Sequence, residues 1–353
     1  MDQNMNQREL KPASTLMYNE AAEASTVVAR QIDSNNALVT SAVKRILDFA
    51  PRSVATMARG SSDHAATYAK YLIETRLGLL TASAAPSVAS IYQTRPKLDG
   101  TLYIAFSQSG KSPDLLANVK AAKASGALTL AMVNVEDSPL AQMVDIVLPL
   151  GAGPEKSVAA TKSYIATLSS ILHLVAGISG DASLNEGLSA LPEGLARAWE
   201  LDWSEQGVGT LKNANNMFVI GRGLGLGVAQ EAALKFKETS GLHAEAYSSA
   251  EVKHGPMAIV NKDFPLLVFG QQDETRAGVD QVVSEFLARG AKVLYAADGE
   301  QGSHALPVVQ NVNPAIEPIL AVQSFYRMAN AISIARGYNP DEPPHLNKVT
   351  ETL

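Results

Sequence analysis

The chain has 353 residues, of which 46% are hydrophobic, and its formal net charge at pH 7 is −6. This length exceeds the size at which single cores usually stop growing, so we expect two domains. The chain has no cysteine, which excludes disulfides, thiolate metal sites and a cysteine nucleophile. The acidic charge without a basic block argues against nucleic acid or an anionic membrane as partner, and the lack of a signal peptide or a spanning apolar run predicts a cytoplasmic protein.

The first half of the chain alternates short apolar runs with helical patterns. A leading helix is expected near 18–49. Strands are predicted near 53–58, 81–85, 101–106, 127–133 and 145–149, and helices near 62–77, 113–125 and 157–178. This alternation is typical of a parallel sheet with helices on both faces.

The segment after the third predicted strand has the composition of a phosphate site. It reads Ser107-Gln108-Ser109-Gly110-Lys111-Ser112, and Ser112 can cap a helix whose first residue is Pro113. A helix N-terminus behind a strand offers free N–H groups and a positive dipole end to an anion. Such clusters also form plain turns, and the segment matches neither Walker A nor the dinucleotide fingerprint. Its hydroxyl groups favour a small phosphomonoester over a pyrophosphate.

The second half of the chain repeats the first. Arg59 aligns with Arg222 and Phe106 with Phe269, each pair 163 residues apart, and Glu74 aligns with Glu238. After a linker helix near 184–200, strands are predicted near 216–221, 243–247, 264–269, 291–296 and 306–310, and helices near 226–241, 275–289 and 315–337. Two copies of one α/β unit follow from this periodicity.

The predicted architecture is therefore two tandem α/β domains. Each is a parallel five-stranded sheet flanked by helices, in a flavodoxin- or Rossmann-like three-layer sandwich. The predicted boundaries are an N-terminal segment and leading helix at 1–40, a phosphate-binding domain at 41–190, a reaction domain at 205–340 and a tail at 341–353 that closes the site.

The two copies differ where a ligand would bind. Residues 270–275 of the second copy read Gly-Gln-Gln-Asp-Glu-Thr, and the two acids would repel a phosphate. The second copy instead carries polar stretches at 235–238, 243–247 and 251–256. We interpret the first copy as the binding half and the second as the reacting half.

Six motifs in order along the chain carry a resemblance to a known family. They are Ser-Gln-Ser-Gly at 107–110, Ser-Val-Ala-Ala-Thr-Lys at 157–162, Glu-Ala-Ala-Leu-Lys-Phe-Lys-Glu at 231–238, His-Ala-Glu-Ala-Tyr at 243–247, Lys-His-Gly-Pro-Met at 253–257 and Leu-Asn-Lys-Val-Thr at 346–350. Together they resemble the double sugar isomerase (SIS) module of glucosamine-6-phosphate synthase, from about residue 40 to the end. The chain lacks that synthase's amidotransferase domain and its cysteine. It is more similar to the free-standing SIS-type glucosamine-6-phosphate deaminases.

The resemblance implies roles for individual residues. The expected substrate- and phosphate-binding residues are Ser61, Ser62, Ser107, Gln108, Ser109, Ser112 and Val158. Glu238 would carry a proton between C1 and C2, and His254 would assist ring opening, supplied by a neighbouring subunit of a homodimer. Lys235 either orients the Glu238 carboxylate or forms only a helix ion pair with it. Lys348 resembles a lysine that forms a Schiff base in the synthase, and in a deaminase it would only close the pocket.

The implied activity is deamination of glucosamine 6-phosphate to fructose 6-phosphate and ammonium, with no metal or organic cofactor. Three neighbouring activities stay open: another phosphosugar isomerase, a fructosamine-6-phosphate deglycase and a galactosamine-6-phosphate deaminase/isomerase. A non-catalytic sugar phosphate sensor is the alternative from another class. Glu238, His254 and Lys348 together disfavour the sensor, as does the lack of a DNA-binding segment before the module.

Overall fold

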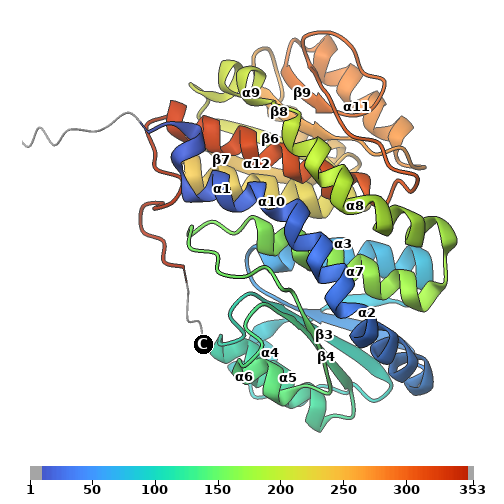
Figure 1. The fold of residues 1–353 in the computed structure, drawn as a ribbon. Coiled ribbons are helices and arrows are strands. Elements are labelled where there is room, and N and C mark those ends of the chain that lie inside the picture. The colour runs from blue at the N-terminus through green and yellow to red at the C-terminus, as the bar shows by residue number, and fades with distance from the viewer. Residues whose placement is uncertain (1–9, 349–353) are drawn as a thin grey trace, which may run out of the picture.

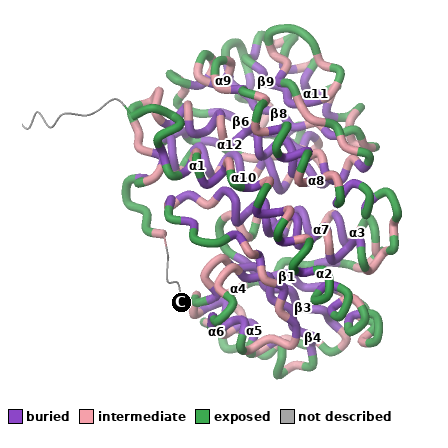
Figure 2. Tube along the Cα trace, viewed as in Figure 1, coloured by how far each residue is buried: buried purple, intermediate pink, exposed green. Residues whose placement is uncertain are grey.

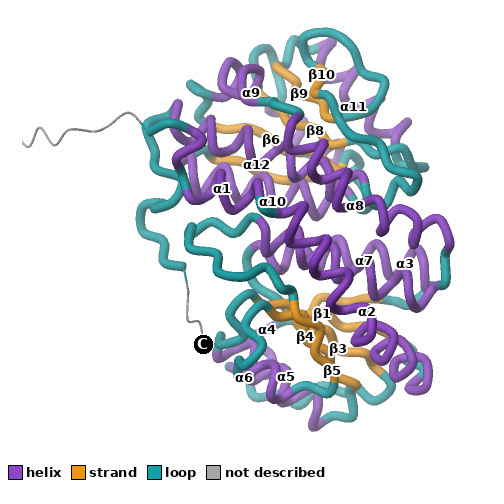
Figure 3. Tube along the Cα trace, in the orientation of Figure 1, coloured by secondary structure: helices purple, strands orange, loops and turns teal. Residues whose placement is uncertain are grey.

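Two parallel five-stranded sheets form the centres of the two halves of the computed structural model, which describes residues 10–348 (Figures 1 and 3). The first sheet holds β1 (Ser53–Met57), β2 (Thr81–Ser83), β3 (Thr101–Ser107), β4 (Leu128–Val133) and β5 (Ile146–Pro149), in the order β2-β1-β3-β4-β5. The second holds β6 (Asn216–Gly221), β7 (His243–Ser248), β8 (Pro265–Phe269), β9 (Lys292–Ala296) and β10 (Ala305–Leu306), in the order β10-β9-β8-β6-β7. Both sheets have the same topology, so the predicted duplicated α/β fold is confirmed.

The central strands are buried along their whole length because helices cover both faces of each sheet. Every residue of β3, β4 and β8 is buried, as expected for apolar runs in a parallel sheet. The helices of the first half are α1 (Leu16–Ala22), α2 (Ala24–Phe49), α3 (Ser61–Leu77), α4 (Pro86–Ser90), α5 (Pro113–Ala124), α6 (Pro139–Met143) and α7 (Lys162–Ser179). Those of the second are α8 (Ala182–Glu200), α9 (Ser204–Leu211), α10 (Gly225–Ser240), α11 (Arg276–Ala288) and α12 (Glu317–Ala335). Short 3₁₀ turns are η1 (Pro12–Ser14), η2 (Glu251–His254) and η3 (Pro256–Ile259).

Three element predictions were wrong in their extent. The helix expected from residue 157 begins at Lys162, because the carboxylate of Glu155 accepts hydrogen bonds from the backbone N–H groups of Thr161 and Ser163 and holds the preceding residues as a loop. The leading helix is interrupted at Glu23, and the last strand has only two residues. Residues 1–9 of the predicted N-terminal segment and 349–353 of the predicted tail lie outside the described residues.

The helices between the two sheets join the halves through one apolar core. Helices α3, α7, α10 and α12 occupy this middle layer (Figure 1), and their inward faces are buried (Figure 2). Helix α3 of the first half packs directly on α10 of the second. The crossing is close at Gly227, where an added Cβ would lie 2.6 Å from the carbonyl oxygen of His64. The site described below depends on this crossing, because α3 and α10 each contribute to it.

Gly227→Ala is expected to lower the urea midpoint of unfolding, because the methyl group meets backbone that cannot move without separating the helices. Overpacking of this kind costs about 1–3 kcal/mol. Gly209→Ala is the matched control: it also lies within a helix, α9, and its added Cβ meets nothing within 4 Å. This control should be stabilised by about 0.5–1 kcal/mol through helix propensity. Equal midpoints for the two variants would contradict the tight crossing.

Across residues 10–348, no helix is both long and apolar enough to span a bilayer.

Candidate functional site

The first sheet has its topological switch point between β1 and β3. From β1 the sheet continues to β2 on one side, and from β3 to β4 on the other. The loops that leave the carboxyl ends of β1 and β3 therefore diverge, and ligands of open parallel sheets bind in the crevice between such loops. Helix α3 begins after one of these loops at Ser61, and α5 begins after the other at Pro113. Two helix N-termini thus face the same crevice.

A cavity of about 540 Å³ lies at this switch point. Its lining residues are Arg59, Gly60, Ser61, Ser62, Phe106, Ser107, Gln108, Ser109, Ser112, Leu115, Val158, Ala160, Glu238, Leu346, Asn347 and Lys348. The structure therefore brings together all seven predicted binding residues with Glu238 and Lys348. Lys235 forms an ion pair with Glu238 but does not itself line the cavity. His254 does not line the cavity of its own chain either.

The loop after β3 places Ser107, Ser109 and Ser112 in the lining of the cavity. The Ser107 hydroxyl accepts a hydrogen bond of 2.9 Å from the N–H of Gly110. Gly110 has a φ of 64°, and a Cβ there would lie 2.3 Å from the Ser138 hydroxyl, so only glycine fits. Ser112 stands at the N-cap of α5, but its side chain makes no capping hydrogen bond. Ser112 is instead one of the residues that line the cavity.

Arg59 is a lining residue that the sequence prediction did not include. Its guanidinium donates to the fully buried carboxylate of Asp114, with an Nε–Oδ2 distance of 2.8 Å, and its side chain is 49% exposed. This pairing anchors the loop after β1 to the first turn of α5. The repeat alignment with Arg222 was the available signal, but it gave no reason to choose Arg59 as a site residue.

The opposite wall comes from α10, which carries Glu238. Its carboxylate makes a short hydrogen bond with the ammonium group of Lys235, which is completely buried. Lys235 also lies 3.5 Å from the carboxylate of Glu231, which accepts a 3.0 Å hydrogen bond from Tyr326 and lies 3.2 Å from Nδ1 of His64. Burial alone would lower the pKa of Lys235, but the two carboxylates raise it above its ordinary value. Lys235 is therefore an ammonium ion that fixes the Glu238 carboxylate at the cavity.

Glu231 and His64 were not predicted as parts of this network. The signal for Glu231 was its position four residues before Lys235, which places both on one helix face. In the structure His64 links the first turn of α3 to Glu231 on α10. No sequence spacing indicates a contact between residues 167 positions apart.

The third wall combines the loop before α7 with the C-terminal segment, which runs from the second half back toward the first (Figure 1). Val158 and Ala160 of the loop line the cavity. The Lys348 ammonium group donates to the carboxylate of Glu155 at 3.1 Å and to the carbonyl oxygen of Ser157 at 2.7 Å. Glu155 was not predicted.

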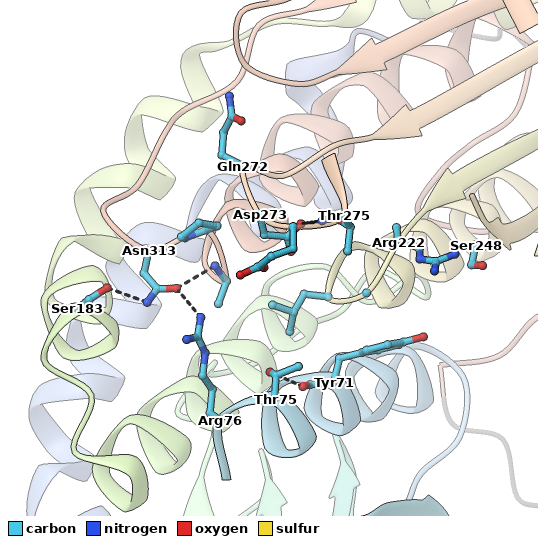
Figure 4. Close-up of a pocket in the computed structure, with 15 residues that line it drawn as sticks. Tyr71, Thr75, Arg76, Ser183, Arg222, Ser248, Gln272, Asp273, Thr275 and Asn313 are labelled. Atoms are coloured by element: carbon cyan, nitrogen blue, oxygen red, sulfur yellow. Dashed lines mark hydrogen bonds between the residues drawn. The ribbon is translucent and has the colours of Figure 1, made fainter. Parts of the chain in front are cut away.

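A larger cavity of about 1090 Å³ occupies the equivalent place in the second half (Figure 4). There the carboxylate of Asp273 accepts hydrogen bonds from the N–H and the hydroxyl of Thr275, at 2.8 and 2.5 Å, in front of α11. Glu74, the repeat counterpart of Glu238, accepts from the N–H of Thr81 and does not line this cavity. This half therefore has the crevice but neither the hydroxyl loop nor the carboxylate of the first site.

Within residues 10–348, no group of three or more His, Asp or Glu side chains is arranged to hold a metal ion.

Comparison with known proteins identifies the family. The SIS domain model matches residues 49–177 and 210–305. The glutamine–fructose-6-phosphate aminotransferase of Thermococcus kodakarensis is 33% identical over 350 residues, which are 94% of this chain and 57% of that protein. The chain thus spans about half the length of the curated relatives it matches.

Solved structures agree with this result. A candidate phosphosugar isomerase from Silicibacter pomeroyi DSS-3 has a TM-score of 0.88 and 42% identity, covering 93% of this chain and 100% of that one. The C-terminal domain of the Francisella tularensis glucosamine-fructose-6-phosphate aminotransferase has a TM-score of 0.83 and 25% identity, covering 94% and 98%. A glucosamine-6-phosphate deaminase from Thermotoga maritima, at 24% identity, shares the fold with a TM-score of 0.78 over 96% of this chain and 100% of that one. The chain belongs to the SIS domain family, as a double-SIS protein homologous to the isomerase part of the glutamine–fructose-6-phosphate aminotransferases.

Proposed function

We propose that this chain is a glucosamine-6-phosphate deaminase, which isomerises an aminosugar phosphate from aldose to ketose and releases ammonia. One observation carries the proposal: a single cavity joins a hydroxyl-lined loop at a helix N-terminus to a carboxylate fixed by a buried ammonium ion. The first feature suits a phosphate group, and the second suits proton transfer at carbon. The loop would bind the phosphate end of an open-chain hexosamine phosphate, and the carboxylate would act at its C1–C2 end.

The phosphate end of the substrate binds at the first half. Ser107, Gln108, Ser109 and Ser112 surround the N-terminus of α5, and Ser61 and Ser62 are the first residues of α3. Hydroxyl and backbone N–H groups donate to the phosphate oxygens, and both helix dipoles favour its charge. This end holds the substrate and takes no part in the chemistry.

The reaction takes place at Glu238. After ring opening, the carboxylate takes the proton from C2, and the electron pair of the C–H bond forms the C1–C2 double bond of an enolamine, while the π pair of the C1 carbonyl moves to its oxygen, which takes a proton from water. When the C1–C2 π pair takes the proton back at C1, the nitrogen lone pair forms the C2–N double bond and nitrogen releases a proton to water, which gives the imine of fructose 6-phosphate. Water adds to the imine carbon, and the C–N bond breaks to leave the ketone and ammonium. The buried Lys235 ammonium group pairs with the Glu238 carboxylate and holds it at the cavity, where it can reach C2 of the substrate.

The decisive experiment supplies glucosamine 6-phosphate and measures ammonium and fructose 6-phosphate together. Release of both in equal amounts supports the proposal. Isomerisation of glucose 6-phosphate without ammonium release from glucosamine 6-phosphate would assign a simple phosphosugar isomerase instead. Galactosamine 6-phosphate and fructosamine 6-phosphate are the parallel substrates, and a faster reaction with either would reassign the enzyme to that substrate. Binding without turnover of any of them would indicate a sensor.

A homodimer in which each chain supplies His254 to its partner's cavity completes the proposal. His254 ends η2, is exposed and lies outside the cavity of its own chain. Mixing the inactive variants Glu238→Gln and His254→Gln tests this arrangement. After subunit exchange, half of the dimers are mixed and each has one complete site, so about a quarter of wild-type activity should return. If His254 acted within its own chain, no activity would return.

A further inference from the structure

Lys348 is held by a carboxylate that no sequence motif singled out. Its Nζ lies 3.1 Å from Glu155 Oε2 and 2.7 Å from the Ser157 carbonyl oxygen, and both acceptors belong to the loop that lines the cavity. We propose that Glu155 is a positioning residue, which fixes Lys348 over the cavity as an ammonium ion. Lys348 then closes the cavity as a cation and does not condense with the substrate's carbonyl group. The proposal rests on the proposed function, because it requires a sugar phosphate in this cavity.

Glu155 is immobile and remains ionised. Its side chain is fully buried, and it accepts hydrogen bonds from the N–H groups of Thr161 and Ser163 and from the Ser163 hydroxyl, at 3.0, 3.1 and 2.6 Å. These groups lie at the start of α7, whose dipole also favours a negative charge. Burial alone would raise the pKa of Glu155, but the Lys348 ammonium group and these hydrogen bonds lower it below its ordinary value.

The loop that carries Glu155 is itself fixed from the opposite side. The carboxylate of Glu20, on α1, accepts hydrogen bonds from the N–H groups of Lys156 and Ser157, at 2.5 and 3.1 Å. The N–H of Val158 donates to the carbonyl oxygen of Asp341 in the C-terminal segment, at 3.3 Å. The loop is therefore preorganised to receive Lys348.

These contacts determine which chemistry Lys348 can perform. An amine attacks a carbonyl carbon through its lone pair, and an ammonium group that donates to a carboxylate and a carbonyl has no lone pair to offer. A glucosamine substrate already carries nitrogen at C2, so its isomerisation needs no imine from the protein. A fixed cation above the cavity stabilises the anionic substrate and excludes water.

A double-mutant cycle tests whether Glu155 acts through Lys348. Glu155→Gln, Lys348→Met and the double variant should each raise KM for glucosamine 6-phosphate by about tenfold, with kcat changed less than KM, because each removes the same closing contact. Glu23→Gln is the control, because Glu23 pairs with Lys162 at 2.6 Å beside the same loop but does not line the cavity. This control should keep wild-type KM. Multiplicative losses, with KM raised about a hundredfold in the double variant, would overturn the proposal.

A second measurement uses the unaltered protein and so does not depend on the folding of a variant. Wild-type enzyme is treated with borohydride in the presence of fructose 6-phosphate, and Lys348 is examined by mass spectrometry. No reduced adduct is expected, and an adduct at Lys348 would overturn the inference. The assay of ammonium release tests the proposed function separately. If no ammonium is released, the deaminase is rejected, but the double-mutant cycle of Glu155 and Lys348 can still be measured as the affinity of each variant for fructose 6-phosphate.

Discussion

Glu238→Gln is expected to abolish ammonium release from glucosamine 6-phosphate while leaving sugar phosphate binding nearly unchanged. The amide cannot accept the C2 proton, and a general base typically contributes about 10²–10⁴-fold to the rate. In the proposed mechanism the phosphate is bound at the other end of the cavity, by the loop from Ser107 to Ser112 that lines it. The variant should therefore lower kcat with a small effect on the dissociation constant of fructose 6-phosphate.

Glu74→Gln is the matched control for this variant. Glu74 occupies the repeat-equivalent position on α3, and its carboxylate accepts a hydrogen bond from the N–H of Thr81 outside both main cavities. It should retain wild-type kcat, which would separate loss of the proton carrier from loss of a helix carboxylate. Wild-type turnover in Glu238→Gln would reject Glu238 as the base and the mechanism with it.

The fold could be predicted because it depends on local signals that occur twice. Apolar runs such as β3 and β8 are buried on both faces, and each is followed by a polar turn and a helix. The loop from Ser107 to Ser112 could be located because strand, loop and helix start are adjacent in the sequence, and its binding of phosphate stays a prediction. Glu238 and Lys348 required the resemblance, since nothing near them in the sequence indicates that they face the same cavity.

The parts that could not be predicted depend on contacts between distant residues. The start of α7 is set by carboxylates of Glu155 and Glu20 that take hydrogen bonds from backbone N–H groups, and Glu20 lies 136 residues away from Lys156. The approach of His64 to Glu231 likewise arises only when α3 packs on α10. Local helix propensity favoured an earlier start for α7, and the tertiary hydrogen bonds outweighed it.

Buried charge organises the site on two sides. Lys235 lies between Glu231 and Glu238 on α10, and Glu155 holds Lys348 in the first half. In each pair the fully buried partner fixes the partner that lines the cavity. Breaking such a pair leaves a buried charge without compensation, which typically costs about 3–5 kcal/mol. Lys235→Met leaves the buried Glu231 carboxylate without its cation and is therefore expected to affect stability as well as activity, whereas Glu238→Gln leaves Lys235 paired with Glu231 and costs less.

Ser109→Asp is expected to remove sugar phosphate binding without destabilising the protein. The substitution places a carboxylate at the N-terminus of α5, where it repels the phosphate and replaces a hydroxyl donor. The second half has a comparable arrangement, because Asp273, one residue after the repeat equivalent of Ser109, accepts hydrogen bonds from Thr275 in front of α11. Loss of one hydrogen bond to a charged group costs about 1.5–3 kcal/mol, so the lost hydrogen bond alone should lower the affinity for fructose 6-phosphate at least about tenfold. Repulsion between the new carboxylate and the phosphate should lower it further.

Stability should change in the opposite direction from affinity. A carboxylate near a helix N-terminus is stabilising by about 0.3–1 kcal/mol, so the urea midpoint of Ser109→Asp should equal or exceed that of the wild type. Ser34→Asp, on the exposed face of α2, adds the same charge away from the cavity and should keep wild-type affinity. Calorimetric titration with fructose 6-phosphate measures the first effect and urea unfolding the second. Wild-type affinity in Ser109→Asp would place the phosphate elsewhere, whereas weak binding with a lowered midpoint would mean that the loop had lost its structure.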